Sequence, residues 1–149
     1  MGPSVTLHIR NATATDLERL VSFALSEAKE TEGLTKEPES IREGIRTAHI
    51  NDSVALCWVI ENDTSKVIGS AYVVKELSDW NAAYYWWVQS MYILPEFLGK
   101  GIMDKLIRVV KNVARQERTL DLRLYVHSTN ERAIRAYGTV AFPIQIIGS

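Results

Sequence analysis

The sequence predicts an α+β domain, because two kinds of apolar pattern alternate along a chain of ordinary length. The chain has 149 residues, of which 46% are hydrophobic and 23% charged, as is typical of one folded domain. Short apolar or alternating segments, typical of strands, are separated by longer segments with helical spacing. Their order predicts β-α-α-β-β-β-α-β-α-β, and no repeat or linker divides residues 1–149 into smaller units.

The N-terminal third predicts one strand and two helices. Apolar and polar residues alternate over residues 5–10, which is the period of a strand with one buried face. Thr15 and Glu18 have the spacing of a capping box, and a helical pattern continues from there to about Lys29. After a polar connection, apolar residues over 41–48 predict a second, shorter helix.

The rest of the chain predicts five more strands and two more helices. Residues 54–60 and 67–74 are strand-like and flank a polar turn, which indicates a hairpin. The aromatic segment 84–93 is a further strand, ended by Pro95. The later elements follow by the same periodicities: a helix over 102–118, a strand over 122–126, a helix over 130–142 and a last strand over 144–147.

Charge and composition exclude several classes of partner. Seventeen Lys and Arg residues against eighteen Asp and Glu give a net charge of -1, so no global basic field attracts nucleic acid or anionic lipid. The longest apolar runs have seven residues, whereas a membrane span needs roughly 20. The first residues do not resemble a secretory signal, and Cys57 has no disulfide partner. We therefore expect a cytoplasmic protein that binds neither nucleic acid nor membrane.

Two motifs follow predicted strands and begin predicted helices. Gly99, Lys100 and Gly101 precede a helix, where glycine lets the backbone approach an anion and the helix N-terminus attracts it. This favours a pyrophosphate site, although a tight turn would give the same pattern. Asn130 and Tyr137 belong to the second motif, whose simpler interpretation is a helix cap followed by a core aromatic residue.

Together these motifs resemble the GNAT superfamily of acyl-CoA-dependent N-acyltransferases over nearly the whole chain. Residues 92–102 are similar to the exit of the family's fourth strand and its Gln/Arg-x-x-Gly-x-Gly/Ala loop, and residues 130–137 to its fourth-helix signature. Leu98 and Met103 depart from the usual Gln or Arg and Gly or Ala. The resemblance implies a layered α/β/α fold with a mixed, mostly antiparallel sheet splayed between the fourth and fifth strands.

The resemblance also implies where acetyl-CoA binds. Backbone groups at Met91 and Ile93 are expected to bind the pantetheine arm or the thioester carbonyl, and loop N–H groups to bind the diphosphate. Lys100 is expected to add positive charge. The full set of expected cofactor-binding residues is Met91, Tyr92, Ile93, Leu98, Gly99, Lys100, Gly101, Ile102, Met103, Asn130, Ala133 and Tyr137.

Acetyl transfer to an amine needs a neutral nucleophile, a stabilised oxyanion and a proton for the departing thiolate. Tyr137 aligns with the tyrosine that serves as general acid in many family members. Gln89 stands where a glutamate base is usual, and a neutral amide cannot accept that proton. Either a water chain held by Gln89 and Ser90 carries the proton, or another residue such as His127 accepts it.

The amine acceptor is expected to bind beside the first helix and its following loop. Glu27 and Glu30 are candidates to attract a cationic amine, although acidic residues on such a segment are more often a solvated face. Trp87 belongs to an aromatic set that either lines the acceptor pocket or packs in the core. His127 is a further candidate for this site.

The sequence thus predicts an N-acetyltransferase that transfers an acetyl group directly from acetyl-CoA to a primary amine of a small molecule or protein. Gln89, Leu98 and Met103 motivate the alternative of a non-catalytic acyl-CoA-binding module. A dinucleotide-binding domain is disfavoured, because the third glycine is missing and Asp121 precedes its strand. The histidines and Cys57 lack metal-ligand spacing, so no metal is expected.

Family members usually have one or two further strands after the position of Ile147. Either a longer chain or a neighbouring subunit, as in a homodimer, is therefore expected to supply them.

Overall fold

The fold is built on one mixed sheet of six strands in the order β1-β2-β3-β4-β5-β6. The computed structural model describes residues 6–32, 37–50, 52–127 and 144–147. The pairs from β1 to β4 are antiparallel, whereas β4 with β5 and β5 with β6 are parallel. The strands are β1 (His8–Asn11), β2 (Ala55–Glu61), β3 (Val67–Ser78), β4 (Ala83–Ile93), β5 (Asp121–His127) and β6 (Ile144–Ile147).

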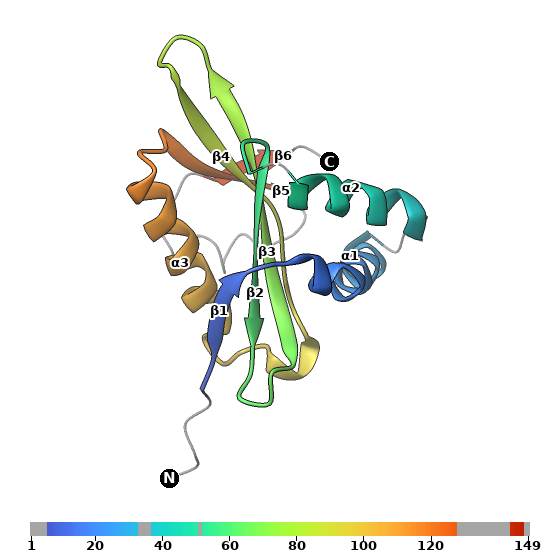
Figure 1. Ribbon diagram of the computed structural model, residues 1–149. Coiled ribbons are helices and arrows are strands. Elements are labelled where there is room, and N and C mark those ends of the chain that lie inside the picture. The colour runs from blue at the N-terminus through green and yellow to red at the C-terminus, as the bar shows by residue number, and fades with distance from the viewer. Residues whose placement is uncertain (1–5, 33–36, 51, 128–143, 148–149) are drawn as a thin grey trace.

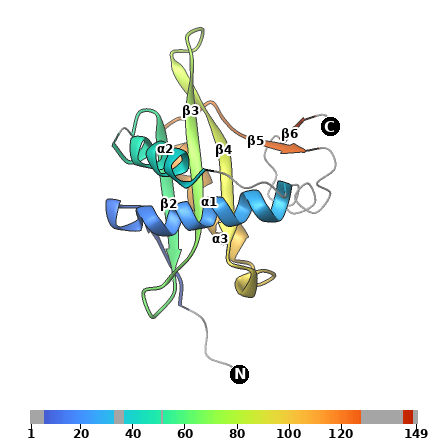
Figure 2. The same ribbon diagram turned by 90° about the vertical axis from the view of Figure 1, so that its right-hand side faces the viewer.

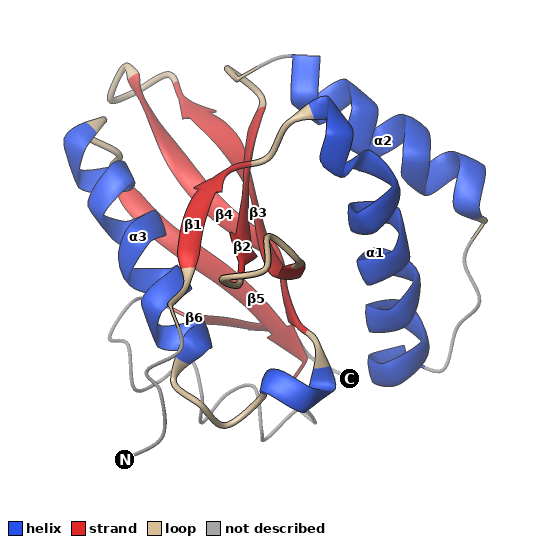
Figure 3. Cartoon of the chain, turned by 60° about the horizontal axis from the view of Figure 1, so that its bottom comes forward, coloured by secondary structure: helices blue, strands red, loops and turns tan. Residues whose placement is uncertain are grey.

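Helices cover both faces of this sheet (Figure 1). The helices α1 (Leu17–Glu32) and α2 (Pro38–Ile50) lie on one face, and α3 (Ile102–Gln116) lies on the other, as Figures 2 and 3 also show. Two short 3₁₀ helices, η1 (Ala14–Asp16) and η2 (Pro95–Phe97), precede α1 and α3. The predicted α/β/α layering is therefore confirmed. None of the described helices is long and apolar enough to cross a membrane.

Each face of the sheet has its own group of buried side chains. Against α3, the residues Trp86, Val88, Leu106 and Val110 belong to a core that is almost fully shielded from solvent. On the other face, α1 contributes to a smaller cluster through Leu20, Phe23, Val59 and Tyr92. The rings of Phe23 and Tyr92 lie 5.0 Å apart between centroids. This contact fixes the position of α1 over the end of β4.

Strand β4 contains one extra residue, Gln89, relative to its neighbour β3. Val88 pairs with Val73 and Ser90 pairs with Tyr72, so Gln89 has no partner residue in β3. A bulge of this kind reverses the alternation of side chains along a strand. Trp86 and Val88 before the bulge therefore face α3 together with Met91 and Ile93 after it. Ser90 and Tyr92 face α1 and α2.

The predicted capping box at Thr15 and Glu18 is wrong, because the turn forms two residues earlier. The N–H of Thr13 donates to the Asp16 carboxylate at 2.7 Å, and Arg10 donates to both oxygens of that carboxylate at 2.8 and 3.1 Å. The side chain of Asp16 is buried and the Arg10 guanidinium lowers its pKa. Because Arg10 pairs with Asp16, the capping turn forms between Thr13 and Asp16, and the ion pair links β1 to the start of α1.

Other elements differ from prediction mainly in length. Helix α1 continues to Glu32, and the β3–β4 hairpin extends to Ser78 and Ala83. These ends are polar or exposed, so apolar periodicity did not mark them. The last strand, β6, is confirmed over residues 144–147. The predicted helix over 130–142 lies outside the described residues.

Candidate active site

Strands β4 and β5 separate halfway along β4. Their register runs from Tyr85 opposite Asp121 to Val88 opposite Leu124, and residues 89–93 have no partner in β5. On its other edge, the strand β5 pairs with β6 from Leu124 to His127. The predicted splay between the fourth and fifth strands is thus present. It begins beside the bulge at Gln89 and leaves one edge of β4 without a strand partner among the described residues.

The loop that follows β4 leads directly into the N-terminus of α3. Gly99 and Gly101 have φ angles of +77° and +74°, a region that residues with a Cβ rarely adopt. Gly101 is the N-cap of α3, where no side chain bonds the first N–H groups. No atom lies within 4 Å of a Cβ built at either glycine, so the backbone is open to a bulky anion. The dipole of α3 favours negative charge at this end.

The side chains around these glycines leave the loop accessible. Ile102 is buried, and Met103 packs against the core on the α3 face. The atypical Met103 therefore turns toward the protein interior. Lys100 is exposed, with its Nζ 5.8 Å from the centroid of the Phe97 ring, and Leu98 is 39% exposed. The arrangement can bind an anion mainly through backbone groups, with one lysine nearby.

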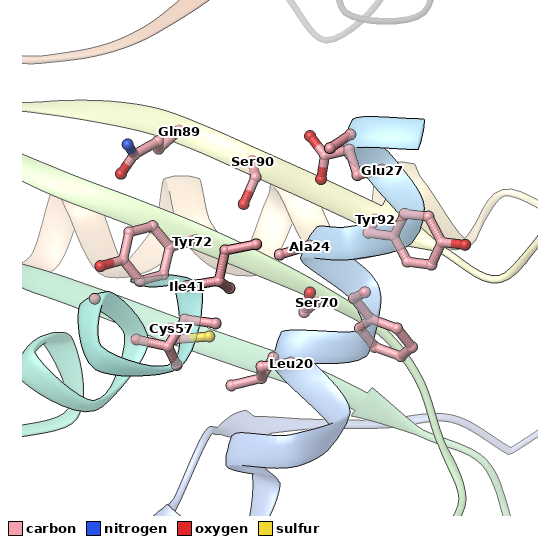
Figure 4. Close-up of a pocket in the computed structure, with 14 residues that line it drawn as sticks. Leu20, Ala24, Glu27, Ile41, Cys57, Ser70, Tyr72, Gln89, Ser90 and Tyr92 are labelled. Carbon is pink, nitrogen blue, oxygen red and sulfur yellow. The ribbon is translucent and has the colours of Figure 1, made fainter. Parts of the chain in front are cut away.

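A cavity of about 400 Å³ lies on the opposite face of the sheet, between α1, α2 and the strands (Figure 4). This volume is within the range of small-molecule sites. Helices α1 and α2 supply most of the apolar wall, and β3 and β4 supply hydroxyl and amide groups. The lining residues are Leu20, Phe23, Ala24, Glu27, Ala28, Ile41, Gly44, Ile45, Cys57, Ser70, Tyr72, Gln89, Ser90 and Tyr92.

Four of the predicted site residues, Glu27, Gln89, Ser90 and Tyr92, line this cavity. Gln89 and Ser90 both line it, because the bulge gives two consecutive residues access to the same face. Glu27 lines it from α1. Glu30 instead accepts a hydrogen bond from the Tyr92 hydroxyl at 3.3 Å. Burial raises the pKa of Tyr92, with a further contribution from Glu30, so this phenol remains protonated at neutral pH.

Cys57 also lines the cavity, but it is a poor nucleophile. Burial raises the pKa of its thiol to about 12. The reactive thiolate is therefore nearly absent at neutral pH, and Cys57 serves as a small apolar wall residue.

Other predicted residues lie apart from the cavity or outside the described residues. Trp87 is 9% exposed and packs beneath Arg123, whose guanidinium carbon is 5.4 Å from its ring centroid. It is a packing residue and does not line the cavity. His127 ends β5, but its side chain is not described. Asn130, Ala133 and Tyr137 lie outside the described residues.

Asp121 argues against dinucleotide binding. It pairs with Tyr85 near the beginning of β4, whereas the glycine loop follows the end of that strand. Its carboxylate instead lies 3.7 Å from Arg123. Among the described residues, no three His, Cys, Asp or Glu side chains are grouped to hold a metal ion.

Sequence reasoning missed the part of the cavity wall supplied by β3 and α2. Ser70 and Tyr72 are two residues apart and so share one face of β3, and Ile41, Gly44 and Ile45 have helical spacing. These spacings could have assigned each set to one face. They could not have shown that the two faces lie opposite each other.

A separated pair of central strands, a glycine loop at a helix N-terminus and a cavity across the sheet are the features expected of an acyl-CoA-dependent acyltransferase. The chain belongs to the acetyltransferase (GNAT) family, whose model matches residues 17–142. No curated protein matches the chain.

Solved structures agree with this assignment. A possible acetyltransferase from Clostridium difficile 630 is 29% identical, with a TM-score of 0.84 over 90% of this chain and 88% of that one. A ribosomal-protein-alanine N-acetyltransferase from Brucella melitensis biovar Abortus 2308 is 17% identical, with a TM-score of 0.75 and 91% of both chains covered. An aminoglycoside N-acetyltransferase in complex with CoA is 14% identical, with a TM-score of 0.79 over 95% of this chain and 91% of that one. The last two show similarity of fold alone.

Proposed function

We propose that this protein transfers an acetyl group directly from acetyl-CoA to a primary amine of a small molecule or protein. The observation that carries the proposal is the separation of β4 from β5 beside Gln89. It lies between a loop suited to an anion and a cavity suited to a small ligand. One end of the separation would hold a phosphate-bearing donor and the other an acceptor.

The described residues are suited to acetyl-CoA, which supplies an activated acetyl thioester when bound. Backbone N–H groups from Gly99 to Met103 would hold its diphosphate, helped by the dipole of α3, whereas the N–H of Leu98 already donates to the carbonyl oxygen of Pro95 at 3.2 Å. The edge of β4 at Met91 and Ile93 has no β5 partner, so its backbone groups would bind the pantetheine arm. Tyr92 lies between these two positions, with its side chain held against α1.

Protein side chains would donate and accept the protons of the reaction. We assign the role of general acid to Tyr137 on the basis of the family resemblance. Gln89 and Ser90 line the cavity and would hold water that carries a proton away from the amine. His127 is the alternative acceptor. Glu27 would attract the ammonium form of the acceptor before that proton is lost.

The substitution Tyr137→Phe tests the assignment of the acid. It should lower kcat by about 100-fold, because loss of a positioned acid typically costs 10² to 10⁴ in rate. Release of free CoA from acetyl-CoA would be followed in the presence of a panel of amines. Tyr84→Phe, a half-exposed hairpin position, is the matched control. Unchanged kcat in Tyr137→Phe, with unchanged unfolding by urea, would remove Tyr137 from this role.

Gln89 favours one alternative, a module that binds acyl-CoA without turnover. Its neutral amide stands in the cavity where a base is expected. Calorimetric binding of acetyl-CoA with no CoA release for any amine would support this alternative. A cytosolic location and a homodimer also remain predictions. Imaging of a tagged chain and light scattering, respectively, test them.

A further inference from the structure

The cavity between α1, α2 and the sheet has an uneven distribution of polar groups. Among the described residues that line it, Glu27 is the only one with a formal charge, and none is basic. Leu20, Ile41 and Ile45 give much of the remaining wall an apolar character. A single carboxylate matches one ammonium group, whereas a polycation would leave its other charges against apolar side chains.

Glu27 and Gln89 are separated in space from Leu20 and Cys57, and the Ser70 hydroxyl lies between the two groups. Figure 4 shows Gln89, Ser90 and Glu27 along one side of the cavity, with Leu20 and Cys57 on the opposite side. The polar side includes the bulge, where β5 leaves β4. An amine placed there for reaction would extend the rest of its structure toward the apolar side.

Helix α2 contains a gap in the wall of this apolar side. Ile41, Gly44, Ile45 and Ala48 have the spacing of one helix face, and three of them carry apolar side chains. Gly44 has none, and no atom lies within 4 Å of a Cβ built there. Glycine within a helix is unfavourable relative to alanine, so a side chain at this position would fit the helix but occupy part of the cavity.

We infer that the acceptor is a primary amine with one positive charge and an apolar body, and that Gly44 sets the space available to that body. This inference rests on the proposed function. The ammonium group binds near Glu27 and Ser90, and the apolar body lies between α1 and α2. Gly44 is thus a specificity-determining position, at which side-chain size selects among acceptors.

A series of linear amines from ethylamine to octylamine tests the inference. The kcat/KM for acetyl-CoA-dependent CoA release should rise by about fourfold for each methylene that becomes buried, until the cavity is full. Spermidine, kanamycin and a peptide with an N-terminal alanine serve as polycationic and peptide acceptors. They should have lower kcat/KM values than octylamine.

Substitution at Gly44 tests the position itself. Gly44→Leu should lower kcat/KM for octylamine at least about tenfold more than for ethylamine, because the new side chain occupies the space of the longer chain. Thr47→Leu, at an exposed position of the same helix that does not line the cavity, is the matched control and should not change this ratio. Circular dichroism and the dissociation constant of acetyl-CoA report whether each variant remains folded.

The outcomes separate the inference from the proposed function. Higher kcat/KM for spermidine, kanamycin or the peptide would overturn the inference while supporting an acetyltransferase. An equal loss for ethylamine and octylamine in Gly44→Leu would also overturn it. If no amine causes CoA release, the proposed function fails. Calorimetric binding of octylamine that Gly44→Leu abolishes would then still support an amphipathic amine site, and absence of that binding would overturn it.

Discussion

Two glycines with equally open surroundings should respond in opposite directions to the same substitution. Neither Gly101 nor Gly44 has an atom within 4 Å of a built Cβ, so a methyl group meets no steric contact at either position. Gly101 has a φ of +74°, whereas Gly44 lies within α2. Only the backbone conformation distinguishes the two sites.

The expected magnitudes follow from this difference. A residue with a Cβ in the left-handed region costs roughly 1–2 kcal/mol, partly offset by about 0.4–1 kcal/mol from a more restricted unfolded chain. Gly101→Ala should therefore lower the free energy of unfolding by about 1 kcal/mol. Gly44→Ala should raise it by about 0.5–1 kcal/mol, because alanine is the better helix former.

Urea unfolding followed by circular dichroism measures both changes, provided that the slope with denaturant stays constant. Calorimetry with CoA adds a second measurement. Gly101→Ala should weaken CoA binding because it disturbs the loop before α3, whereas Gly44→Ala should leave CoA affinity unchanged. Shifts of the same sign in the two variants would show that the positive φ of Gly101 does not constrain the loop.

Three further predictions concern the ion pair, the thiol and the bulge. Asp16→Asn should cost about 2–4 kcal/mol of unfolding free energy by removing the carboxylate that pairs with Arg10. The folded pKa of Asp16 is lowered, so the stability that its carboxylate contributes is present above the unfolded pKa of about 4 and is lost as the pH falls through the folded pKa. Thermal melts of the two proteins from pH 5 to 2 should therefore converge. Cys57 should react with iodoacetamide at pH 7.5 at least about 100-fold more slowly in the folded than in the urea-unfolded chain, and comparable rates would contradict a thiol pKa of about 12. Gln89→Ala should lower kcat about tenfold without changing the calorimetric affinity for acetyl-CoA, and an unchanged kcat would exclude a role for its amide in proton transfer.

Much of the fold could be predicted because local pattern and burial agree. Residues 67–74 and 84–93 lie in strands, and the amphipathic pattern of α3 matches a helix with one buried face. The loop at Gly99 and Gly101 could also be predicted, since glycine before a helix has a specific conformational use. In these segments, each neighbouring residue supports the same structure.

The parts that could not be predicted depend on contacts between distant segments. The bulge at Gln89 has no local signature, because, apart from Ser90, the residues on both sides of it are apolar or aromatic on both faces of the strand. Thr15 and Glu18 have good capping spacing, but Arg10 pairs with Asp16 instead. Trp87 could line a pocket or pack in the core, and the position of Arg123 favours packing.

The additional residue of β4, Gln89, also determines which polar groups this strand presents to the cavity. Removing Gln89 would restore uninterrupted alternation and leave Ser90 and Tyr92 on the face of α1 and α2, because Val88 and Ser90 already pair with consecutive residues of β3. Met91 and Ile93 would likewise remain in the core against α3. A one-residue deletion at this position would thus remove one amide from the cavity wall and leave the buried clusters on both faces of the sheet in place.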